Sequence, residues 1–444
     1  MNKTRYSTRI ALIKSHSVDF FLDVKTLVSG SVAAQFILLL SLPIVTRLYT
    51  PVDFGVLQGL ESVVQITMII CSLGYEKAFV SAAGLDRNKL LFLSLLLACT
   101  LSFVGASIAI VLLPKLAHSI QSEYITNEQM MILLVFIFLG RCIFWVFSNY
   151  ALSIALYTET AITEFTRAAG LVLSRILFGV LNLSVAGLLL SSLVGSIFGL
   201  SRLFQRTRSH WNKDLRSMSM SAGISTARKY RAFPANEGTG EFCSVLTDRL
   251  PVVLLGYSFG PAAAGYYAIP LLVVSRPIGI LVNSASTVLR TRIGSRFSTK
   301  EPLLRSVDNT NLIIIWSSTI LIVILAAIAS PVFFPLIFGS EWTQAGAIVT
   351  LLAPKILALM LLRPLLGSLS AMRMLRPILL VRASMLIAVL SPLIAGPHIF
   401  GLDLNMTILA MSTSAFLCGL TALFFLYTGI KRPTVIAKSR NRYD

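Results

Sequence analysis

Long, uninterrupted runs of apolar residues constrain this chain more than any other feature of its sequence. One run extends from Leu90 to Leu113, and similar runs recur along most of the 444 residues. A helix needs about 20 mostly apolar residues to cross the hydrocarbon core of a bilayer. The runs are continuous rather than alternating, which is not the pattern of strands in a membrane barrel. We therefore expect an all-α membrane protein.

The overall composition supports this interpretation. Hydrophobic residues make up 55% of the chain and charged residues only 13%, about half of the roughly 25% found in soluble domains. A soluble protein of this length could not cover its surface with so few charges. The composition therefore excludes a soluble globular protein, a disordered chain and a secreted disulfide scaffold.

The apolar runs predict about twelve transmembrane helices. The fifth and sixth spans are separated only near Leu183, and Asp248, Arg249 and Pro251 interrupt the seventh. The predicted limits are 27–46, 56–74, 90–113, 130–154, 165–182, 184–201, 238–258, 264–288, 311–333, 343–369, 377–397 and 405–429.

The distribution of basic residues predicts the orientation in the membrane. The chain has 38 Lys and Arg against 19 Asp and Glu, a formal net charge of +19. With twelve spans and a cytoplasmic N-terminus, 28 of the basic residues fall in cytoplasmic segments, and only Arg47 and Lys115 lie outside. Such a bias follows the positive-inside rule. We expect a multi-pass protein of the cytoplasmic (inner) membrane with both termini inside, and no nucleic-acid partner.

The two halves of the chain resemble each other. Pro51-x-x-x-Gly55 follows the first predicted span and Pro261-x-x-x-Gly265 follows the seventh, at a shift of 210 residues. We expect two six-helix bundles related by a parallel repeat about an axis along the membrane normal. The predicted domains are a basic N-tail (1–25), an N-terminal bundle (26–204), a cytoplasmic linker (205–237), a C-terminal bundle (238–430) and a basic C-tail (431–444). The N-tail fits either an amphipathic helix on the inner membrane surface or a disordered tail.

Basic residues inside the spans are the clearest functional signal. Eight lie there, against two clearly acidic residues, and each costs about 2.5–3.5 kcal/mol at a helix centre. Arg167 and Arg382 lie near cytoplasmic helix ends, where the side chain can reach water. The others either bond to backbone carbonyls and polar side chains or line a cationic cavity for an anionic ligand. We favour the cavity, and phosphate or pyrophosphate as its ligand, because the guanidinium fork binds oxyanions bidentately. The predicted substrate contacts are Arg141, Arg175, Arg249, Arg276 and Lys355.

The two intramembrane acids, Glu61 and Asp248, are candidates for coupling transport to H⁺ or Na⁺, although a salt bridge to a nearby Arg is the simpler interpretation. The five cysteines lie in mostly apolar stretches and the four histidines are scattered. We therefore expect no disulfide, metal site or cofactor.

No enzyme signature is present. The sequence lacks the Walker A, GxSxG, HExxH and Rossmann glycine patterns. The longest predicted loop, 202–237, is too short for an ATPase or glycosyltransferase domain. We therefore expect a protein that is not an enzyme and that uses an ion gradient, the substrate gradient or a separate subunit.

Several short motifs resemble one family of membrane proteins. The run Arg47-Leu48-Tyr49-Thr50-Pro51-Val52-Asp53-Phe54-Gly55 resembles the first outside loop of the polysaccharide biosynthesis (Wzx-type) flippases, within the multidrug/oligosaccharidyl-lipid/polysaccharide exporter superfamily. Other matching segments, in the same order, are Ser29-Gly30-Ser31 with Gln35, Gly74-Tyr75-Glu76-Lys77-Ala78, Phe259-Gly260, Ala264-Gly265-Tyr266-Tyr267-Ala268 and Phe338-Gly339-x-Glu341-Trp342. The chain departs from the pattern at Pro270, where a small or apolar residue is expected.

The resemblance implies a flippase that moves undecaprenyl-pyrophosphate-linked oligosaccharide from the cytoplasmic to the outer leaflet by alternating access, for surface polysaccharide synthesis. It implies membrane lipid, a polymerase and a chain-length protein as partners, and a structural role for Pro51 and Gly55. Two alternatives stay open: a cation-coupled multidrug exporter of the same superfamily, and a membrane-embedded glycan polymerase or ligase. Drug exporters usually need acidic pockets, and the enzymes usually show a large outside loop.

Overall fold

The computed structural model describes residues 30–72, 74–117, 127–215, 220–231, 238–286, 309–371 and 374–431, apart from positions 31, 81, 83 and 285. The described residues form helices and short connections, with no strand among them. The predicted N-tail 1–25 and the predicted C-tail 431–444, except Lys431, lie outside this part of the chain, as do most of the predicted loops 114–129 and 289–310. The long helices are Val32–Leu48, α2 (Pro51–Ser72), α3 (Leu85–Ala117), α4 (Asn127–Ser153), α5 (Tyr157–Val180), α6 (Ser184–Leu215), α8 (Thr239–Phe259), Pro261–Ser284, α11 (Asn309–Phe338), α12 (Thr343–Ala371), α13 (Leu375–Ile399) and α14 (Leu404–Lys431).

Each predicted span overlaps one of these long helices. Ten are long and apolar enough to cross a membrane. The helix Val32–Leu48 is shorter, and α5 carries four charged side chains, Glu159, Glu164, Arg167 and Arg175. The predicted all-α membrane fold is therefore confirmed, with six long helices in each half of the chain.

The backbone geometry shows how the chain runs in the two places where the predicted spans are least distinct, near Leu183 and near Pro251. Residues 181–183 form a turn between α5 and α6, and Asn182 and Ser184 adopt positive φ values of 54° and 45° there. By contrast, α8 is continuous from Thr239 to Phe259 and contains Pro251 within it. The chain therefore turns near Leu183 and passes through Pro251 without a break.

The sixth helix is longer than predicted, which corrects its predicted end at residue 201. It continues to Leu215 because Leu203, Thr207 and Trp211 are buried at a spacing of four residues, so that one face of the extension stays packed. A further short helix, α7 (Met220–Lys229), lies in the predicted linker, where the apolar runs predict no span.

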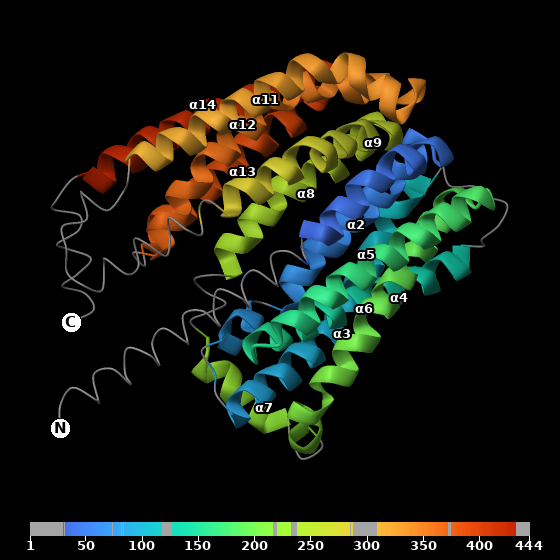
Figure 1. The fold of residues 1–444 in the computed structure, drawn as a ribbon, viewed down its shortest axis with the longest axis vertical. Helices are drawn as coiled ribbons and strands as arrows, with labels where there is room; N and C mark the ends of the chain where they lie inside the picture. The colour runs from blue at the N-terminus through green and yellow to red at the C-terminus, as the bar shows by residue number, and fades with distance from the viewer. Residues whose placement is uncertain are drawn as a thin grey trace, which may run out of the picture. The chain divides into compact units, whose positions relative to one another are not determined.

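The chain divides into two compact units. Met1–Val45, Ile70–Ser107 and Glu123–Phe233 form the first, and Thr46–Ile69, Ile108–Ser122 and Pro234–Asp444 form the second. In the first unit α6 packs against α4 and α5 (Figure 1). In the second unit α12 packs against α9 (Pro261–Pro270), α11 and α14, while α13 packs against α8 and α14. The domain limits drawn from the sequence stay a prediction.

A capping box starts α2 and explains part of the first-half motif. The Thr50 backbone N–H and hydroxyl both donate to the Asp53 carboxylate at 2.9 Å, and the Asp53 N–H donates back to the Thr50 hydroxyl at 3.3 Å. Pro51 occupies the first helical position, where its missing N–H costs nothing. Thr50, Pro51 and Asp53 therefore build a helix start.

The repeated Pro-x-x-x-Gly motifs pack against each other within the second unit. A Cβ atom at Gly55 would overlap the Pro261 carbonyl oxygen and lie 3.0 Å from the Gly265 nitrogen. Reciprocally, a Cβ atom at Gly265 would overlap the Pro51 carbonyl oxygen and lie 3.2 Å from the Gly55 nitrogen. Two helix starts cross backbone to backbone here, and only glycine allows so close an approach.

Trp342 anchors the connection between α11 and α12 at this crossing. Gly339 turns the chain with a φ of 104°, and the fully buried Trp342 follows in the short 3₁₀-helix Ser340–Trp342. The indole Nε1 donates to the Thr46 carbonyl oxygen at 3.1 Å, and the ring packs edge-on against Phe54 and Tyr266. The family-like motifs around Pro51, Tyr266 and Trp342 thus form one packed structural cluster.

The helix that begins at Pro261 continues through Pro270, because the helical turn after this proline is wider than a regular α-helical turn. Residues Leu271–Ser275 directly after this proline are π-helical, and a regular helix resumes at Arg276. A proline inside a helix lacks an N–H and its ring crowds the preceding turn. The π-helical segment accommodates this, and such segments often lie at functional sites.

Candidate functional site

Lys355 is the most buried of the basic residues predicted to contact substrate. It lies on α12 about 18 Å along the helix axis from Thr343, by the rise of 1.5 Å per residue, and only 1% of it is exposed. Its Nζ donates a hydrogen bond of 2.6 Å to the hydroxyl of Tyr267 on α9, and it also lies 5.3 Å from the centre of that ring. Tyr267 itself is completely buried.

Arg363, two helical turns further along α12, contacts the same neighbouring helix. Its Nη1 donates to the Asn283 side-chain oxygen at 3.2 Å. A Cβ atom at Gly279 would lie 3.1 Å from that nitrogen, so the guanidinium passes close to the glycine backbone. Absence of a side chain at Gly279 leaves room for the arginine.

Arg276 lies on the helix face that Arg363 contacts. Arg276, Gly279 and Asn283 are spaced at i, i+3 and i+7, which places them on one side of a regular helix. Lys355, Arg363 and Arg276, with the partners Tyr267 and Asn283, therefore line one helix–helix boundary, which we name the basic seam. The two α12 residues are about 12 Å apart along their helix axis.

Acidic residues are few on the elements around the basic seam. Glu341 lies on the 3₁₀-helix Ser340–Trp342, which contacts α12, and Glu241 and Asp248 lie on α8, which packs against α9. No Asp or Glu occurs on α9, α11, α13 or α14, the long helices that pack against α12. Opposite charges or hydrogen-bond acceptors normally accompany basic groups taken out of water. The composition of the seam thus suits an anion.

The remaining candidate residues of the second unit lie on other helices. Arg249 and Asp248 are neighbours on α8, where Arg249 is half-buried and Asp248 exposed. Glu61 is half-buried on α2. The structure therefore brings two of the five predicted contacts, Arg276 and Lys355, to one helix boundary.

In the first unit, Arg175 on α5 faces α6. Its Nε donates to the Ser191 hydroxyl at 3.4 Å, and Ser191 is completely buried. Arg141 is half-buried on α4. Arg167, nearer the predicted cytoplasmic end of α5, pairs with Glu164 at 3.1 Å and lies 5.4 Å from the ring centre of Phe144.

Sequence reasoning left three members of the basic seam out of the predicted site: Arg363, Asn283 and Tyr267. The spacing of eight residues between Lys355 and Arg363 is a signal for Arg363, because it returns to the same helix face after about two turns. The contact of Tyr267 with Lys355 joins residues 88 positions apart, and no local pattern indicates it. Within the described residues, no group of three or more His, Cys, Asp or Glu side chains could hold a metal ion.

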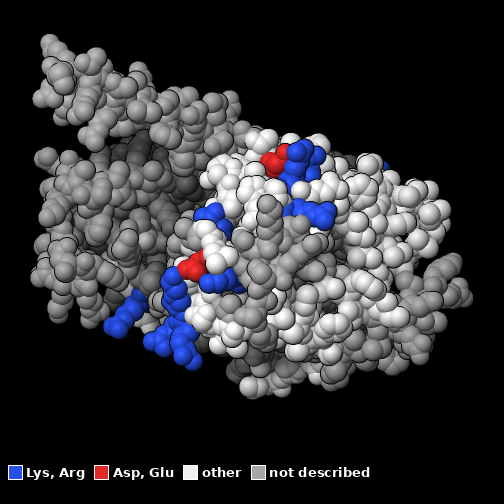
Figure 2. Space-filling view, turned by 90° about the horizontal axis from the view of Figure 1, so that it is seen from below, with Lys and Arg blue, Asp and Glu red and all other residues white. Residues whose placement is uncertain are grey.

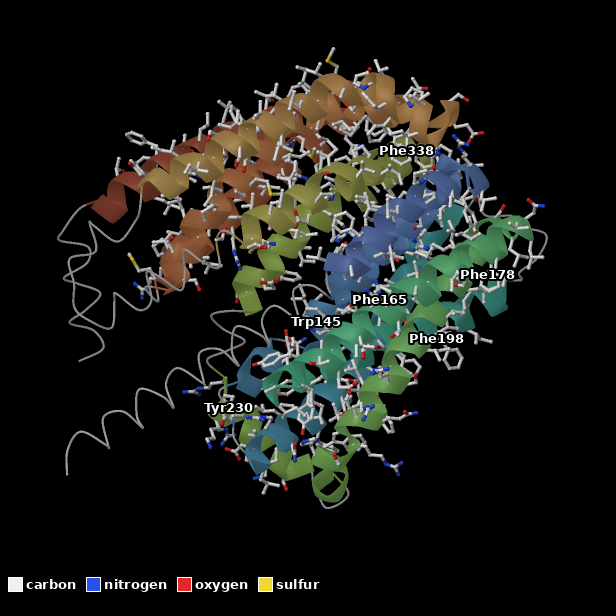
Figure 3. The ribbon with its side chains drawn as sticks, viewed as in Figure 1. Trp145, Phe165, Phe178, Phe198, Tyr230 and Phe338 are labelled. Atoms are coloured by element: carbon white, nitrogen blue, oxygen red, sulfur yellow. The ribbon has the colours of Figure 1, made fainter. Side chains whose placement is uncertain are left out.

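A second charged cluster lies where α7 meets the start of α3. Lys229 pairs with Asp86, and the Tyr230 hydroxyl lies 3.5 Å from the same carboxylate (Figure 3). The hydrogen bond and the attraction of Asp86 raise the pKa of Lys229. Burial raises the pKa of Tyr75, whose hydroxyl donates to the Ala227 carbonyl at 3.2 Å. In the view of Figure 2 the visible acidic side chains lie against basic neighbours.

These observations define a class: an all-helical, multi-pass membrane protein of two similar halves, with basic side chains inside its spans. Sequence comparison narrows the class. A family model described as polysaccharide biosynthesis protein matches residues 44–347, more than half of the chain. The chain belongs to this polysaccharide biosynthesis protein family. A search of curated protein sequences gives no match.

Solved structures show the same fold. An inward-facing multidrug resistance MATE family transporter of the MOP superfamily is 11% identical, with 93% of this chain and 95% of that chain covered and a TM-score of 0.64. The eukaryotic MATE transporter AtDTX14 is 14% identical over 95% and 99%, with a TM-score of 0.58. A MOP superfamily transporter from Pyrococcus furiosus is 12% identical over 92% and 94%, with a TM-score of 0.55.

Proposed function

We propose that this protein is a flippase for a lipid-linked oligosaccharide. It moves an undecaprenyl-pyrophosphate-linked glycan from the cytoplasmic to the outer leaflet by alternating access, for the synthesis of surface polysaccharide such as O-antigen, capsule or exopolysaccharide. The observation that carries the proposal is the basic seam, because it places Lys355 and Arg363 on a span-forming helix whose neighbours α9, α11, α13 and α14 carry no acid. Family membership supplies the link to polysaccharide.

The chemistry of the basic seam favours a pyrophosphate group as the recognised part of the substrate. Pyrophosphate offers several acceptor oxygens and negative charge, which guanidinium and ammonium groups bind as charge-assisted donors. The lipid tail would stay in the bilayer while the headgroup crosses. Arg141, Arg175 and Arg249 remain further proposed contacts.

A multidrug exporter is the second candidate, because the similar folds include multidrug MATE transporters. A cationic drug would need acidic partners, and α9, α11, α13 and α14, which pack against α12, offer none. The transporter from Pyrococcus furiosus is described as having a binding pocket of reverse polarity that suggests a different function. Pocket polarity can therefore separate functions on this fold, and here it favours an anionic substrate.

We propose a transporter rather than a membrane-embedded glycan polymerase or ligase. Four of the described connections between consecutive long helices are short: 181–183, Gly260, 339–342 and 400–403. The proposed location of the protein is the cytoplasmic membrane, with both termini on the cytoplasmic side, where basic loops are retained. A polymerase and a chain-length protein are the proposed partners. Glu61 and Asp248 remain the proposed candidates for ion coupling.

Alanine variants test the function in cells that depend on this protein for surface polysaccharide. Arg276→Ala, Arg363→Ala and Lys355→Ala should each abolish or strongly reduce surface polysaccharide while the protein stays in the membrane. Arg382→Ala is the matched control, because Arg382 is also a span arginine but pairs with Glu241 at 3.9 Å, away from the seam. Normal export by all three seam variants would overturn the proposed function of the seam.

A further inference from the structure

The Lys355–Tyr267 pair has more hydrogen-bond donors than its surroundings can satisfy. A charged lysine has three N–H donors, and a tyrosine hydroxyl has one donor besides its acceptor lone pairs. Lys355 Nζ uses one donor on the Tyr267 hydroxyl, at 2.6 Å. Neither side chain makes another hydrogen bond within the described part of the chain. Two donors of the Lys355 ammonium group are therefore left for a ligand.

The immediate surroundings of the pair are apolar. Leu352 and Ile356, which flank Lys355 on α12, are buried, and so is Ile269 next to the tyrosine on α9. Titratable groups on the elements packed against α12 are few. The acid among them is Glu341, which lies on the 3₁₀-helix Ser340–Trp342, more than three turns before Lys355. α11 carries none, and α9, α13 and α14 carry Tyr266, Tyr267, Arg376, Arg382, His398, Cys418, Tyr427 and Lys431. Within the described residues, Lys355 therefore has no ion pair and no hydrogen bond besides the one to Tyr267.

The geometry points to Tyr267 as a positioning residue for Lys355. In the resting protein, the Tyr267 hydroxyl accepts the hydrogen bond from Lys355 Nζ. When the substrate binds, one of its phosphate oxygens takes the place of that hydroxyl. This inference rests on the proposed function and names the subsite for its anionic group. The neutral hydroxyl is a weaker acceptor than an ionised phosphate oxygen, so it holds the ammonium without preventing exchange.

Because the Tyr267 hydroxyl and the phosphate oxygen accept from the same atom, Tyr267 competes with the substrate for Lys355 Nζ as well as positioning it. Removing the hydroxyl should leave the resting ammonium without its acceptor, while phosphate still binds it. Phosphate should then bind more tightly, and its release should be slower because no group takes its place. If Tyr267 had only a structural role, removing its hydroxyl would change the stability of the fold but would not increase the affinity for phosphate.

Binding measurements on the purified full-length protein in lipid nanodiscs test the inference. The probe is geranylgeranyl pyrophosphate, with geranylgeraniol as the control without phosphates and inorganic pyrophosphate as the control without lipid. We expect Tyr267→Phe to tighten binding of the probe by about tenfold, the scale of one hydrogen bond to a charged group. Lys355→Met should weaken binding by at least as much, and Tyr267→Phe should have no effect in the Lys355→Met background.

Tyr266→Phe is the matched control, because Tyr266 is the adjacent tyrosine and packs edge-on against Trp342 instead. It should leave the affinity unchanged. If wild-type protein binds the probe no better than geranylgeraniol, the proposed function fails. If the wild type binds the probe but Tyr267→Phe leaves the affinity unchanged, weakens it, or tightens it equally in the Lys355→Met background, the role of Tyr267 is overturned while the proposed function stands.

Discussion

Lys355 and Arg363 lie two turns apart on α12 and meet different polar atoms on the neighbouring helix. Lys355 meets a hydroxyl and Arg363 meets a side-chain amide oxygen, and both partners are neutral. A neutral partner orients a basic side chain without cancelling its charge. At the residue scale, this combination distinguishes the basic seam from Arg167, which pairs with the carboxylate of Glu164.

Asn283 gives a direct test of this distinction. Asn283→Asp places a carboxylate where the amide oxygen now accepts from Arg363, so the arginine acquires an ion-pair partner and the seam loses net positive charge. We expect binding of geranylgeranyl pyrophosphate to weaken by about tenfold or more, the scale of a charge-assisted hydrogen bond, without loss of thermal stability. Asn283→Ala, which removes the acceptor and adds no charge, should retain binding. Equal affinity of the Asp variant and the wild type would contradict this account.

The pair of Lys229 and Asp86 carries a prediction about pH. Because Asp86 raises the pKa of Lys229, the contribution of the pair is present at neutral pH and is lost at the alkaline end, as pH rises from the ordinary lysine pKa of about 10.4 through the raised value. The raised pKa of Tyr75 acts in the same direction, since its hydroxyl donor on Ala227 persists beyond the usual tyrosine range. Protease cleavage within α7 should therefore stay slow at neutral pH and accelerate above about pH 10.

Lys229→Met provides the comparison for that measurement. This variant should make α7 more readily cleaved at pH 7 and should reduce the dependence of the cleavage rate on pH. Arg228→Met, one position earlier on the exposed surface of α7, is the matched control and should behave as the wild type. Cleavage rates that do not respond to either pH or Lys229→Met would show that the pair does not hold α7.

At the element scale, the crossing of α2 and α9 depends on two glycines that occupy equivalent places in the repeat. The prolines at the first helical positions set the direction of both helices, and the glycines four residues later allow the backbones to touch. The sequence shows both motifs but not their mutual contact. Tertiary packing of segments 210 residues apart determines that contact.

Gly55→Ala should destabilise this crossing. The new Cβ would overlap the Pro261 carbonyl oxygen, and the backbone would have to move, at a cost of about 1–3 kcal/mol typical of overpacking. The midpoint of thermal unfolding in detergent should fall. Gly140→Ala is the matched control, because its Cβ would meet the Ser196 Cβ at an ordinary 3.5 Å and alanine favours helix. A drop for Gly140→Ala as large as that for Gly55→Ala would contradict the role of close approach.

The sequence predicts the spans well because a bilayer helix is specified by length and apolar content alone. It predicts the extension of α6 and the short α7 poorly, because these helices depend on a few buried side chains such as Trp211 and on contacts with distant segments. For the site, depth and charge indicated Lys355 and Arg276 as basic residues within the spans. The neighbouring polar residues Tyr267 and Asn283 could not be predicted, because a neutral side chain within a span does not by itself indicate a binding site.

At the scale of the whole molecule, a repeated six-helix arrangement and basic residues within the spans suit alternating access for an anionic headgroup. Most of the +19 charge lies in predicted cytoplasmic segments and bears on orientation. The smaller basic remainder within the spans bears on the substrate. The central claim is therefore that this protein moves a pyrophosphate-linked glycan lipid between leaflets.

The most direct test is translocation in liposomes that contain the purified protein and a fluorescent undecaprenyl-pyrophosphate oligosaccharide. A membrane-impermeant reagent that quenches the label reports how much lipid reaches the outer leaflet. The account predicts protein-dependent translocation that Arg363→Ala and Lys355→Met reduce at least tenfold, while Arg382→Ala leaves it intact. Translocation no faster than in protein-free liposomes, or equal rates for the wild type and both seam variants, would contradict it.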